Sequence, residues 1–454
     1  MKTLRNRYAA IGRHLVESSW VLIVLTLALT ACGNDDPIPS LLTYSTVAVG
    51  DLNGDGRLDI AVAYSLVAGP PPHPGYVAVY QQAPANRGTF LGPQHYSVGN
   101  DPASIALGDL TGEGNLDIVT ANYDLGNGAG TVSVLLQDPT RPGQFLPATT
   151  YATGTHPNSV AIGDLNGDGK PDLAVADSDG ISVLLQNPAA PGTFLPRTVI
   201  NVGGSASSVA IADLNGDGKP DLVVTNSVST LVLLQDPTTA GTFLAPTSYS
   251  AGPGPVDAVV GDLDGDGRPD IAVANEGSLS DPGSASVSVL LQDPAVPGGF
   301  LPAVDYSTDF SSAVVVIADL NGDGRADLVV GNVGVFGLCP PNCFTVGTSV
   351  STLLQDPALT GQFQPAINYP AIGNDFVSGV AVGDMNGDGK PDLVVVQAGS
   401  GVFIRLQDPS HPGQFLAGSQ NMFAGLPHEV GGDGLLVPSA NLGIREASGP
   451  RQAR

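Results

Sequence analysis

An acidic nine-residue segment recurs seven times along this chain of 454 residues, each time between two short apolar runs. The copies follow the pattern Asp-x-Asn-Gly-Asp-Gly-x-x-Asp and begin at Asp51, Asp109, Asp164, Asp213, Asp262, Asp319 and Asp384. Successive copies start 49 to 65 residues apart. A unit of about fifty residues that recurs in this way predicts a repeat architecture, in which each unit packs against its neighbours.

The third unit predicts four short strands separated by turns. Its apolar runs at residues 160–163 and 173–176 flank the acidic segment, and an Asp-Gly hairpin signal precedes a third run at residues 181–186. A turn rich in Pro and Gly leads to a fourth run, which begins at Phe194 and extends to residue 199. The other units follow the same order.

Seven four-stranded units in succession are typical of a β-propeller, in which each unit forms one blade. We therefore expect an all-β, seven-bladed β-propeller of four-stranded antiparallel blades over residues 41–423, with the acidic loops between the first and second strands. A β-helix has much shorter coils, and separate domains of about fifty residues would be barely stable alone.

The sequence leaves alternatives open for the structure at the two ends of the repeat region. Residues 424–454 are expected to be a degenerate partial repeat or a flexible tail, because the Gly-Gly-Asp-Gly stretch at residues 431–434 lacks the remaining loop ligands. Residues 41–44 resemble the fourth strand of other units. This segment could therefore pair with the last blade and close the ring.

The first 31 residues have the features of a secretory signal peptide. Four basic residues precede a short apolar stretch at residues 21–29, and Cys32 follows shortly after it. This ending resembles a bacterial lipobox, which implies a lipid on Cys32 and a tether over residues 32–40. The resemblance predicts a membrane-anchored protein of the bacterial cell envelope, an outer-membrane lipoprotein facing the periplasm or the cell surface. An ordinary secretory signal with an incidental cysteine is the alternative.

The chain is strongly acidic, with a net charge of −26. This charge argues against nucleic acid as a partner. Of the 43 acidic residues, 22 lie inside the seven loops. Carboxylates packed this densely normally bind a cation, which compensates their mutual repulsion.

Oxygen donors at alternate positions of each loop predict a calcium site. Positions 1, 3, 5 and 9 offer side-chain oxygens, position 7 offers its backbone carbonyl, and glycines at positions 4 and 6 permit tight turns. A donor set without Cys or His argues against zinc and copper, and flexible carboxylates favour calcium over magnesium. Simple Asp-Gly and Asn-Gly turns are the alternative.

We expect up to seven structural calcium ions. Their ligands would be Asp51, Asn53, Asp55, Arg57, Asp59; Asp109, Thr111, Glu113, Asn115, Asp117; Asp164, Asn166, Asp168, Lys170, Asp172; Asp213, Asn215, Asp217, Lys219, Asp221; Asp262, Asp264, Asp266, Arg268, Asp270; Asp319, Asn321, Asp323, Arg325, Asp327; and Asp384, Asn386, Asp388, Lys390, Asp392.

The loop and the strand after it resemble the FG-GAP and VCBS repeat families, whose propeller repeats also occur in integrin α-subunits. The resemblance covers residues 41–423 and implies calcium between the first and second strands. Phe-Leu-Pro mostly replaces the Phe-Gly and Gly-Ala-Pro elements of the first family. The second loop carries Thr111 and Glu113 in place of the usual residues, so we expect it to bind calcium most weakly.

Cys339 and Cys343 are the remaining cysteines, because Cys32 belongs to the lipobox. A nearby pair in an exported protein usually forms a disulfide, and two free thiols are the alternative. A Cys-x-x-x-Cys pair without further Cys or His ligands makes a poor zinc site.

The units differ in length mainly in the connection between their second and third strands. This connection is longest in the first, second, fifth and sixth units, and in an antiparallel blade it lies at the end opposite the acidic loops. Long loops on a rigid scaffold often bind ligands, although tolerated insertions are the alternative. We expect a protein or glycan ligand here, contacting His73, Tyr76, Tyr123, Phe336 and Phe344.

Catalytic signatures are missing from the sequence. The chain has no Gly-x-Ser-x-Gly elbow, His-Glu-x-x-His helix, phosphate loop or dinucleotide fingerprint, so no catalytic residue is predicted. A non-catalytic binding or adhesion module is the leading interpretation. The alternative is an envelope enzyme, a polysaccharide lyase, hydrolase or oxidoreductase, in which His95, His156 or His411 could serve.

Overall fold

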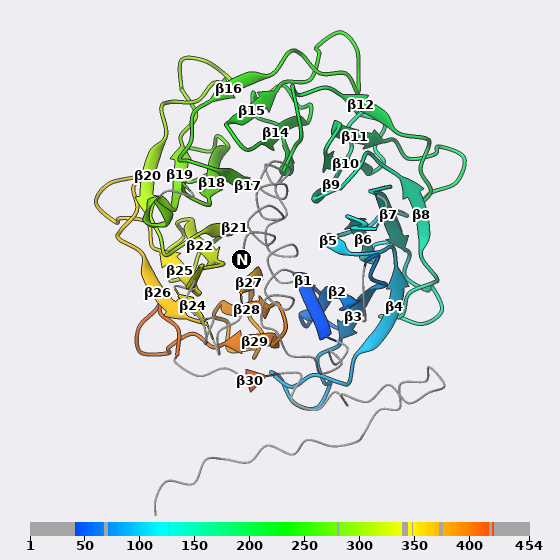
Figure 1. The fold of residues 1–454 in the computed structure, drawn as a ribbon, viewed down its shortest axis with the longest axis horizontal. Helices are drawn as coiled ribbons and strands as arrows, with labels where there is room; N and C mark the ends of the chain where they lie inside the picture. Colours follow the sequence, from blue (N-terminus) through cyan, green and yellow to red (C-terminus); the bar gives the residue numbers. More distant parts are fainter. Residues whose placement is uncertain are drawn as a thin grey trace, which may run out of the picture.

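The computed structural model describes residues 41–67, 71–126, 128–278, 281–337, 344–346, 348–371, 376–416 and 420–421. Within these residues the chain forms seven four-stranded antiparallel sheets around a central axis (Figure 1). The strands of each sheet are hydrogen-bonded in chain order, with the first strand nearest the axis and the fourth at the rim. This arrangement confirms the predicted all-β, seven-bladed propeller. Among the described residues we find no helix with the length and hydropathy that a bilayer-spanning segment needs.

The blades follow one another along the chain. Blade 1 contains β1 (Leu41–Gly50), β2 (Asp59–Val67), β3 (Gly75–Tyr80) and β4 (Gln94–Val98). Blade 2 contains β5 (Pro102–Gly108), β6 (Asp117–Asn122), β7 (Thr131–Leu135) and β8 (Thr149–Ala152). Blade 3 contains β9 (Ser159–Gly163), β10 (Asp172–Asp177), β11 (Gly180–Leu184) and β12 (Thr198–Ile200). Blade 4 contains β13 (Ser208–Ala212), β14 (Asp221–Thr225), β15 (Thr230–Leu233) and β16 (Thr247–Tyr249).

The last three blades carry the additional elements. Blade 5 contains β17 (Pro255–Gly261), β18 (Asp270–Asn275), the 3-10 helix η1 (Pro282–Ser284), β19 (Ser286–Leu290) and β20 (Val304–Ser307). Blade 6 contains β21 (Ser312–Ala318), β22 (Asp327–Asn332), the hairpin strands β23 (Val335–Gly337) and β24 (Phe344–Val346), β25 (Ser349–Leu353) and β26 (Ile367–Pro370). Blade 7 contains β27 (Val377–Gly383), β28 (Asp392–Gln397), β29 (Gly401–Arg405) and β30 (Gln420–Asn421).

The hydrophobic core lies between the blades. Every residue of β10 and β11 is buried, because both faces of a blade pack against neighbouring sheets and both faces therefore require apolar side chains. Between blades 1 and 2, Ala61 and Val77 share a cluster with Ile118. Between blades 1 and 7, Val62 shares a cluster with Val394, so the same kind of packing closes the ring.

Residues 41–44 do not form a fourth strand in blade 7, as one alternative had predicted. They extend the first strand of blade 1, where Leu41 pairs with Val67 and Tyr44 pairs with Tyr64. The nine-residue strand β2 offers hydrogen-bond partners along this whole length. The prediction that this segment closes the ring by strand pairing is therefore wrong.

The fourth strand begins later than the sequence suggested. In blade 3, β12 starts at Thr198, whereas Phe194 makes only an isolated bridge with Gln186. Pro196 separates the two, and its missing amide hydrogen interrupts the hydrogen-bonded ladder. Phe194 is instead buried at the rim, where its ring lies 5.5 Å from that of Tyr151 in blade 2.

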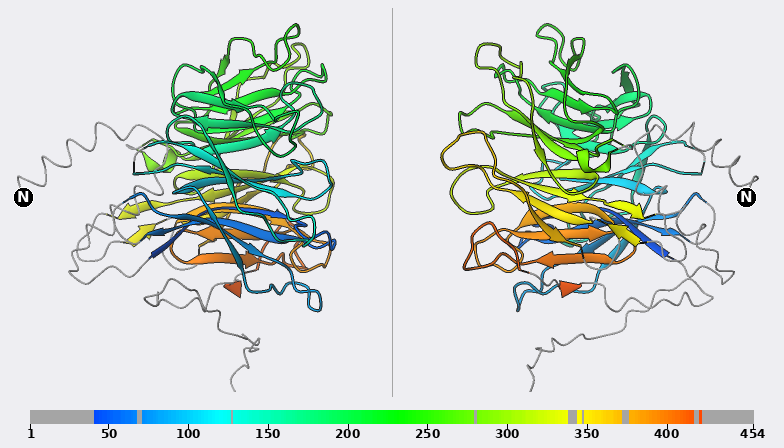
Figure 2. Two further views of the ribbon diagram at one scale, coloured as in Figure 1. Left: turned by 90° about the vertical axis from the view of Figure 1, so that its right-hand side faces the viewer. Right: turned by 60° about the vertical axis from the view of Figure 1, so that its left-hand side comes forward.

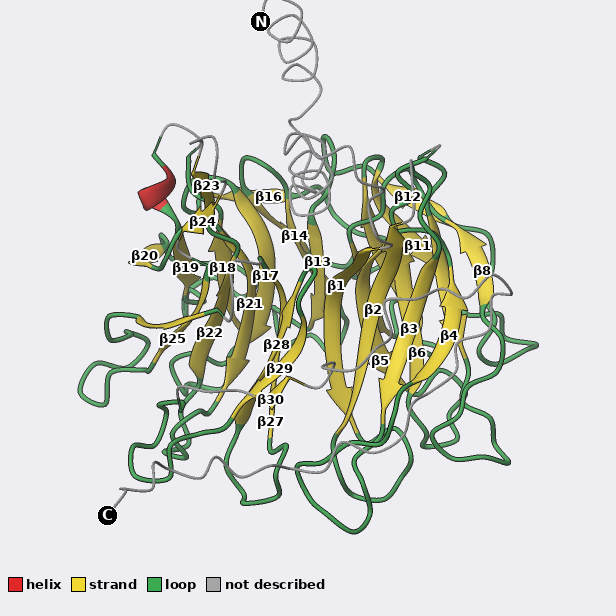
Figure 3. Cartoon of the chain, turned by 60° about the horizontal axis from the view of Figure 1, so that its bottom comes forward, coloured by secondary structure: helices red, strands yellow, loops and turns green. Residues whose placement is uncertain are grey.

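The ring has two different ends. The connections between first and second strands, which contain the acidic loops, lie at the end we call the loop face. The connections between second and third strands lie at the other end, the variable face, and the strands run between the two (Figure 2). Blades 5 and 6 place η1 and the β23–β24 hairpin on the variable face (Figure 3). Cys32 and residues 424–454 lie outside the described residues.

Candidate functional site

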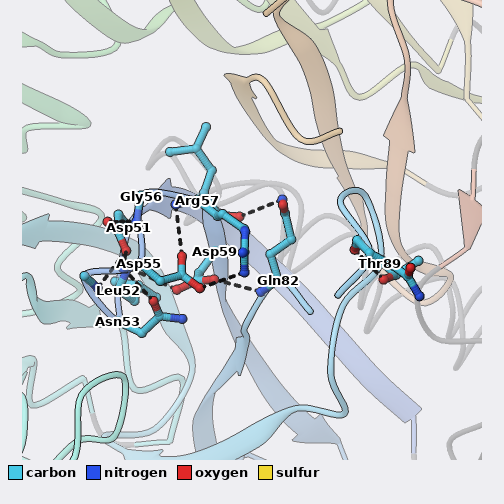
Figure 4. A network of polar contacts seen from close by, with 12 residues as sticks. Asp51, Leu52, Asn53, Asp55, Gly56, Arg57, Asp59, Gln82 and Thr89 are labelled. Atoms are coloured by element: carbon cyan, nitrogen blue, oxygen red, sulfur yellow. Dashed lines mark hydrogen bonds and ion pairs between the residues drawn. The ribbon is translucent and has the colours of Figure 1, made fainter. Parts of the chain in front are cut away.

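Each acidic loop is folded around its first aspartate. In blade 3, Asp164 accepts hydrogen bonds from the amides of Gly167 at 2.8 Å and Gly169 at 2.7 Å. The Asp168 amide donates to Asp164 at 3.0 Å and to Asn166 at 2.9 Å. Gly167 and Gly169 have φ angles of 74° and 82°, a left-handed conformation that explains glycine at positions 4 and 6. Figure 4 shows the equivalent loop of blade 1.

The last aspartate of the loop is a buried anchor. Asp172 accepts hydrogen bonds from the amide of Leu165, within the same loop, at 3.0 Å and from the amide of Gln186, just after β11, at 2.6 Å. The equivalent aspartate makes both bonds in every blade. The aspartate at position 9 therefore connects the loop to the third strand. This structural role is additional to the ligand role that the sequence predicted.

The buried anchor also carries an unfavourable charge. Burial raises the pKa of Asp172 to about 6; the two amide bonds lower this pKa, and the nearby carboxylates of Asp168 and Asp164 raise it. The same causes raise the pKa to about 6 in Asp59, Asp117, Asp270, Asp327 and Asp392, and raise the pKa of Asp221. A cation bound in the loop would stabilise the ionised form of each anchor.

Blade 5 shows most directly how a metal would fit. One carboxylate oxygen from each of Asp262, Asp264 and Asp270, at positions 1, 3 and 9, lies within 4.8 Å of the others. Most other loops have Asn at position 3, which supplies an amide oxygen in the same place. Such an oxygen-only set suits calcium.

The acid at position 5 points elsewhere. Asp55 pairs with Arg57 at 3.1 Å, and the same pairing with position 7 occurs in the loops of blades 3, 5 and 6. In blade 5 the structure thus brings the acids at positions 1, 3 and 9 together, while the acid at position 5, Asp266, pairs with Arg268. Exposed ion pairs of this kind contribute little free energy, so a divalent cation could compete for the carboxylate.

The second loop departs from the pattern, as its sequence indicated. The Thr111 hydroxyl lies 3.4 Å from a carboxylate oxygen of Asp109 and donates to it. A hydroxyl that binds the position 1 carboxylate competes with a metal for the same oxygen. The expectation that this loop binds calcium most weakly stays a prediction.

Two of the predicted ligand-binding side chains of the variable face are buried. His73 is 2% exposed and its Nδ1 lies 2.8 Å from a carboxylate oxygen of Asp101. Tyr123 is 7% exposed and its ring centroid lies 4.6 Å from that of His156, in the connection between blades 2 and 3. Tyr76 is partly buried and stacks on a tyrosine of β2. These contacts hold the connections of blades 1 and 2 in place.

The remaining predicted residues of this face belong to blade 6. Phe336 and Phe344 lie in the β23–β24 hairpin, where Gly337 pairs with Phe344. Cys339 and Cys343 fall outside the described residues, so their disulfide stays a prediction.

The three histidines considered for catalysis lie in different parts of the ring. His95 belongs to β4 and its Nδ1 lies 2.8 Å from the Tyr64 hydroxyl, while burial lowers its pKa. His156 lies between blades 2 and 3, and exposed His411 contacts Asp408 in blade 7. They do not form one site.

Glu276 was not singled out as a functional residue from the sequence. It follows β18 on the variable face, and burial raises its pKa from 4.5 to about 7. A carboxyl with a pKa near neutrality is suited to proton transfer. The sequence places Glu276 in a long connection between strands, but it does not show that the Glu276 side chain is buried.

We predict that Glu276→Gln stabilises the chain at pH 8 and has little effect near pH 4.5. The folded pKa lies above the unfolded value, so the folded chain binds the extra proton and loses stability as the pH rises from about 4.5 to 7. The neutral amide removes this loss. Melting temperatures of the natural chain and the variant at both pH values test this prediction. Asp281→Asn, which changes an exposed acid of the same connection, is the control. An equal shift of the melting temperature at both pH values would contradict the prediction.

Most of the repeat region matches known families of repeat sequences. A family described as FG-GAP-like repeat matches residues 51–120, 122–175, 164–224 and 213–273. A second, described as FG-GAP repeat, matches residues 376–403. No curated protein sequence matches this chain.

Several solved structures share the fold. A proposed 6-phosphogluconolactonase from Bacteroides uniformis is 13% identical, with a TM-score of 0.55 over 85% of this chain and 96% of the other. A lectin from Agrocybe aegerita that recognises non-reducing terminal N-acetylglucosamine is 21% identical, with a TM-score of 0.50 over 83% and 94%. A protein from Lactobacillus plantarum is 14% identical, with a TM-score of 0.51 over 83% and 94%.

Proposed function

Because this chain belongs to the FG-GAP repeat family, we propose that it is an exported, membrane-anchored binding or adhesion module. In this proposal the loop face binds calcium and the variable face binds a protein or glycan. Cys32 carries the lipid that attaches the module to the bacterial cell envelope. The protein itself catalyses no reaction.

The close approach of acidic side chains in the loops is the strongest support for calcium binding. In blade 5 three carboxylates approach one another, and the buried member, Asp270, has a raised pKa. Like charges held together in this way are destabilising unless a cation or protons neutralise them. The ions would then stabilise the scaffold and would leave the binding of a partner to the other face.

The construction of the variable face supports a binding role. Its long connections stand on a rigid ring, and the His73–Asp101 and Tyr123–His156 contacts fix the bases of two of them. A surface that is ordered before binding loses less conformational entropy when a partner docks. Propellers serve as lectins and as enzymes, so the fold alone does not choose between these functions.

Replacing residues 335–346 with a short Gly-Ser turn should weaken ligand binding at least tenfold and preserve the propeller. The β23–β24 hairpin in this range pairs only with itself among the described strands, so its loss leaves the four strands of blade 6 intact. Binding is measured for the full chain on a glycan array in 1 mM calcium, and the melting temperature monitors the fold. A similar replacement of residues 187–192 on the loop face is the control.

Undiminished binding by the hairpin variant would contradict a ligand site on the variable face. Glu276 provides the one specific observation for the alternative, an envelope polysaccharide lyase, hydrolase or oxidoreductase, because its raised pKa suits a general acid or base. A polysaccharide-degradation assay run beside the array distinguishes the two functions. Product formation that Glu276→Gln abolishes would establish the enzyme instead.

A further inference from the structure

Gln235 joins the acidic loops of two different blades. It follows β15 in blade 4, and its Nε2 donates to the carbonyl of Leu165, in the loop of blade 3, at 2.9 Å. The same Nε2 donates to the carbonyl of Pro220, in the loop of its own blade, at 3.0 Å. The side chain is 3% exposed, so water does not compete for these bonds.

The same bridge occurs in all seven blades. The glutamine after each third strand donates to position 2 of the preceding blade's loop and to position 8 of its own: Gln82, Gln137, Gln186, Gln235, Gln292, Gln355 and Gln407. Gln82 of blade 1 reaches Met385 of blade 7 at 3.0 Å. The bridges therefore form a closed circle.

Each bridge acts on the part of the loop that orients two ligands. Leu165 lies between Asp164 and Asn166, at positions 1 and 3. Its amide donates to the loop's own anchor at position 9, and its carbonyl accepts from the glutamine of the next blade. The next blade also supports position 3, because a Cβ at Gly241 would lie only 3.3 Å from the Cβ of Asn166.

We propose that the seven glutamines are positioning residues for calcium, and that each holds the loop of the preceding blade and links its calcium site to the adjacent blade. The inference rests on the calcium binding proposed above. Without its glutamine, the position 2 carbonyl loses a buried donor and the peptide plane between the two ligands can rotate. Calcium in one loop should conversely hold the neighbouring blade in register.

Gln235→Met tests the inference because methionine keeps the length of the side chain and removes both donors. Hydrogen exchange of the full chain is followed by mass spectrometry while calcium is titrated. For residues 164–172, the calcium concentration that gives half-protection should rise about tenfold, the effect of one buried hydrogen bond. Residues 319–327, on the far side of the ring, should keep their midpoint. Gln364→Met, at an exposed position, is the matched control and should shift neither segment.

Gln292→Met repeats the change one blade further and should move the shift to residues 213–221. It also provides the test if the first variant does not fold. An unshifted midpoint at the preceding loop, or an equal shift in every loop, would overturn the positioning role. If the natural chain shows no calcium-dependent protection, calcium binding itself fails, and this result is distinguishable because it needs no variant.

Discussion

Removing calcium with a chelator should lower the melting temperature by about 10 °C, and added calcium should restore it. Extracellular calcium modules bind at about 0.1 to 1 mM, so one site of about 0.1 mM affinity contributes about 1.4 kcal/mol at 1 mM calcium. Seven such sites together contribute on the order of 10 kcal/mol, which is comparable with the whole stability of many domains. The melting temperature of a propeller of this size should respond accordingly.

Differential scanning calorimetry in chelator, in 1 mM calcium and in 1 mM magnesium measures this effect. Magnesium should restore little, because it requires tighter octahedral geometry and retains its water. Identical melting curves in chelator and calcium would eliminate the proposed metal role of the loops.

Asp172→Ala should destabilise the chain by about 3 to 7 kcal/mol in calcium. The substitution removes one metal ligand and leaves the buried amides of Leu165 and Gln186 without an acceptor, at about 1 to 3 kcal/mol each. In chelator the loss should be smaller, because alanine also removes the buried charge that raises the pKa of Asp172.

The matched control is Asp168→Ala at position 5 of the same loop. Asp168 is exposed and accepts one local hydrogen bond from Lys170, so this variant should lose about 1.5 kcal/mol in calcium and almost nothing in chelator. Urea unfolding with and without calcium provides the four free energies. Equal losses for both variants would show that position 9 has no structural task beyond binding metal.

Much of the fold was predictable because the repeat is local. The spacing of the acidic loops indicated the number of blades, and the pattern around Asp164 placed its loop between two strands. Glycine at residues 167 and 169 predicted the two left-handed turns that the structure shows. These features depend on residues that are neighbours in the chain.

The contacts between blades were not predictable in the same way. Gln235 and Leu165 are 70 residues apart, and His73 and Asp101 are 28 apart, so a single sequence does not reveal either pair. For the same reason, aromatic and histidine residues in the long connections suggested a ligand surface, whereas His73 and Tyr123 are buried supports. Burial also determines the raised pKa of Glu276, which composition cannot show.

The number of calcium ions bound per chain tests the central claim most directly. The full chain is dialysed to equilibrium against 1 mM calcium, and bound metal is measured by atomic emission. We predict six to seven ions per chain, since seven loops are present and the one that begins at Asp109 should be weakest. One ion or fewer per chain would contradict the account.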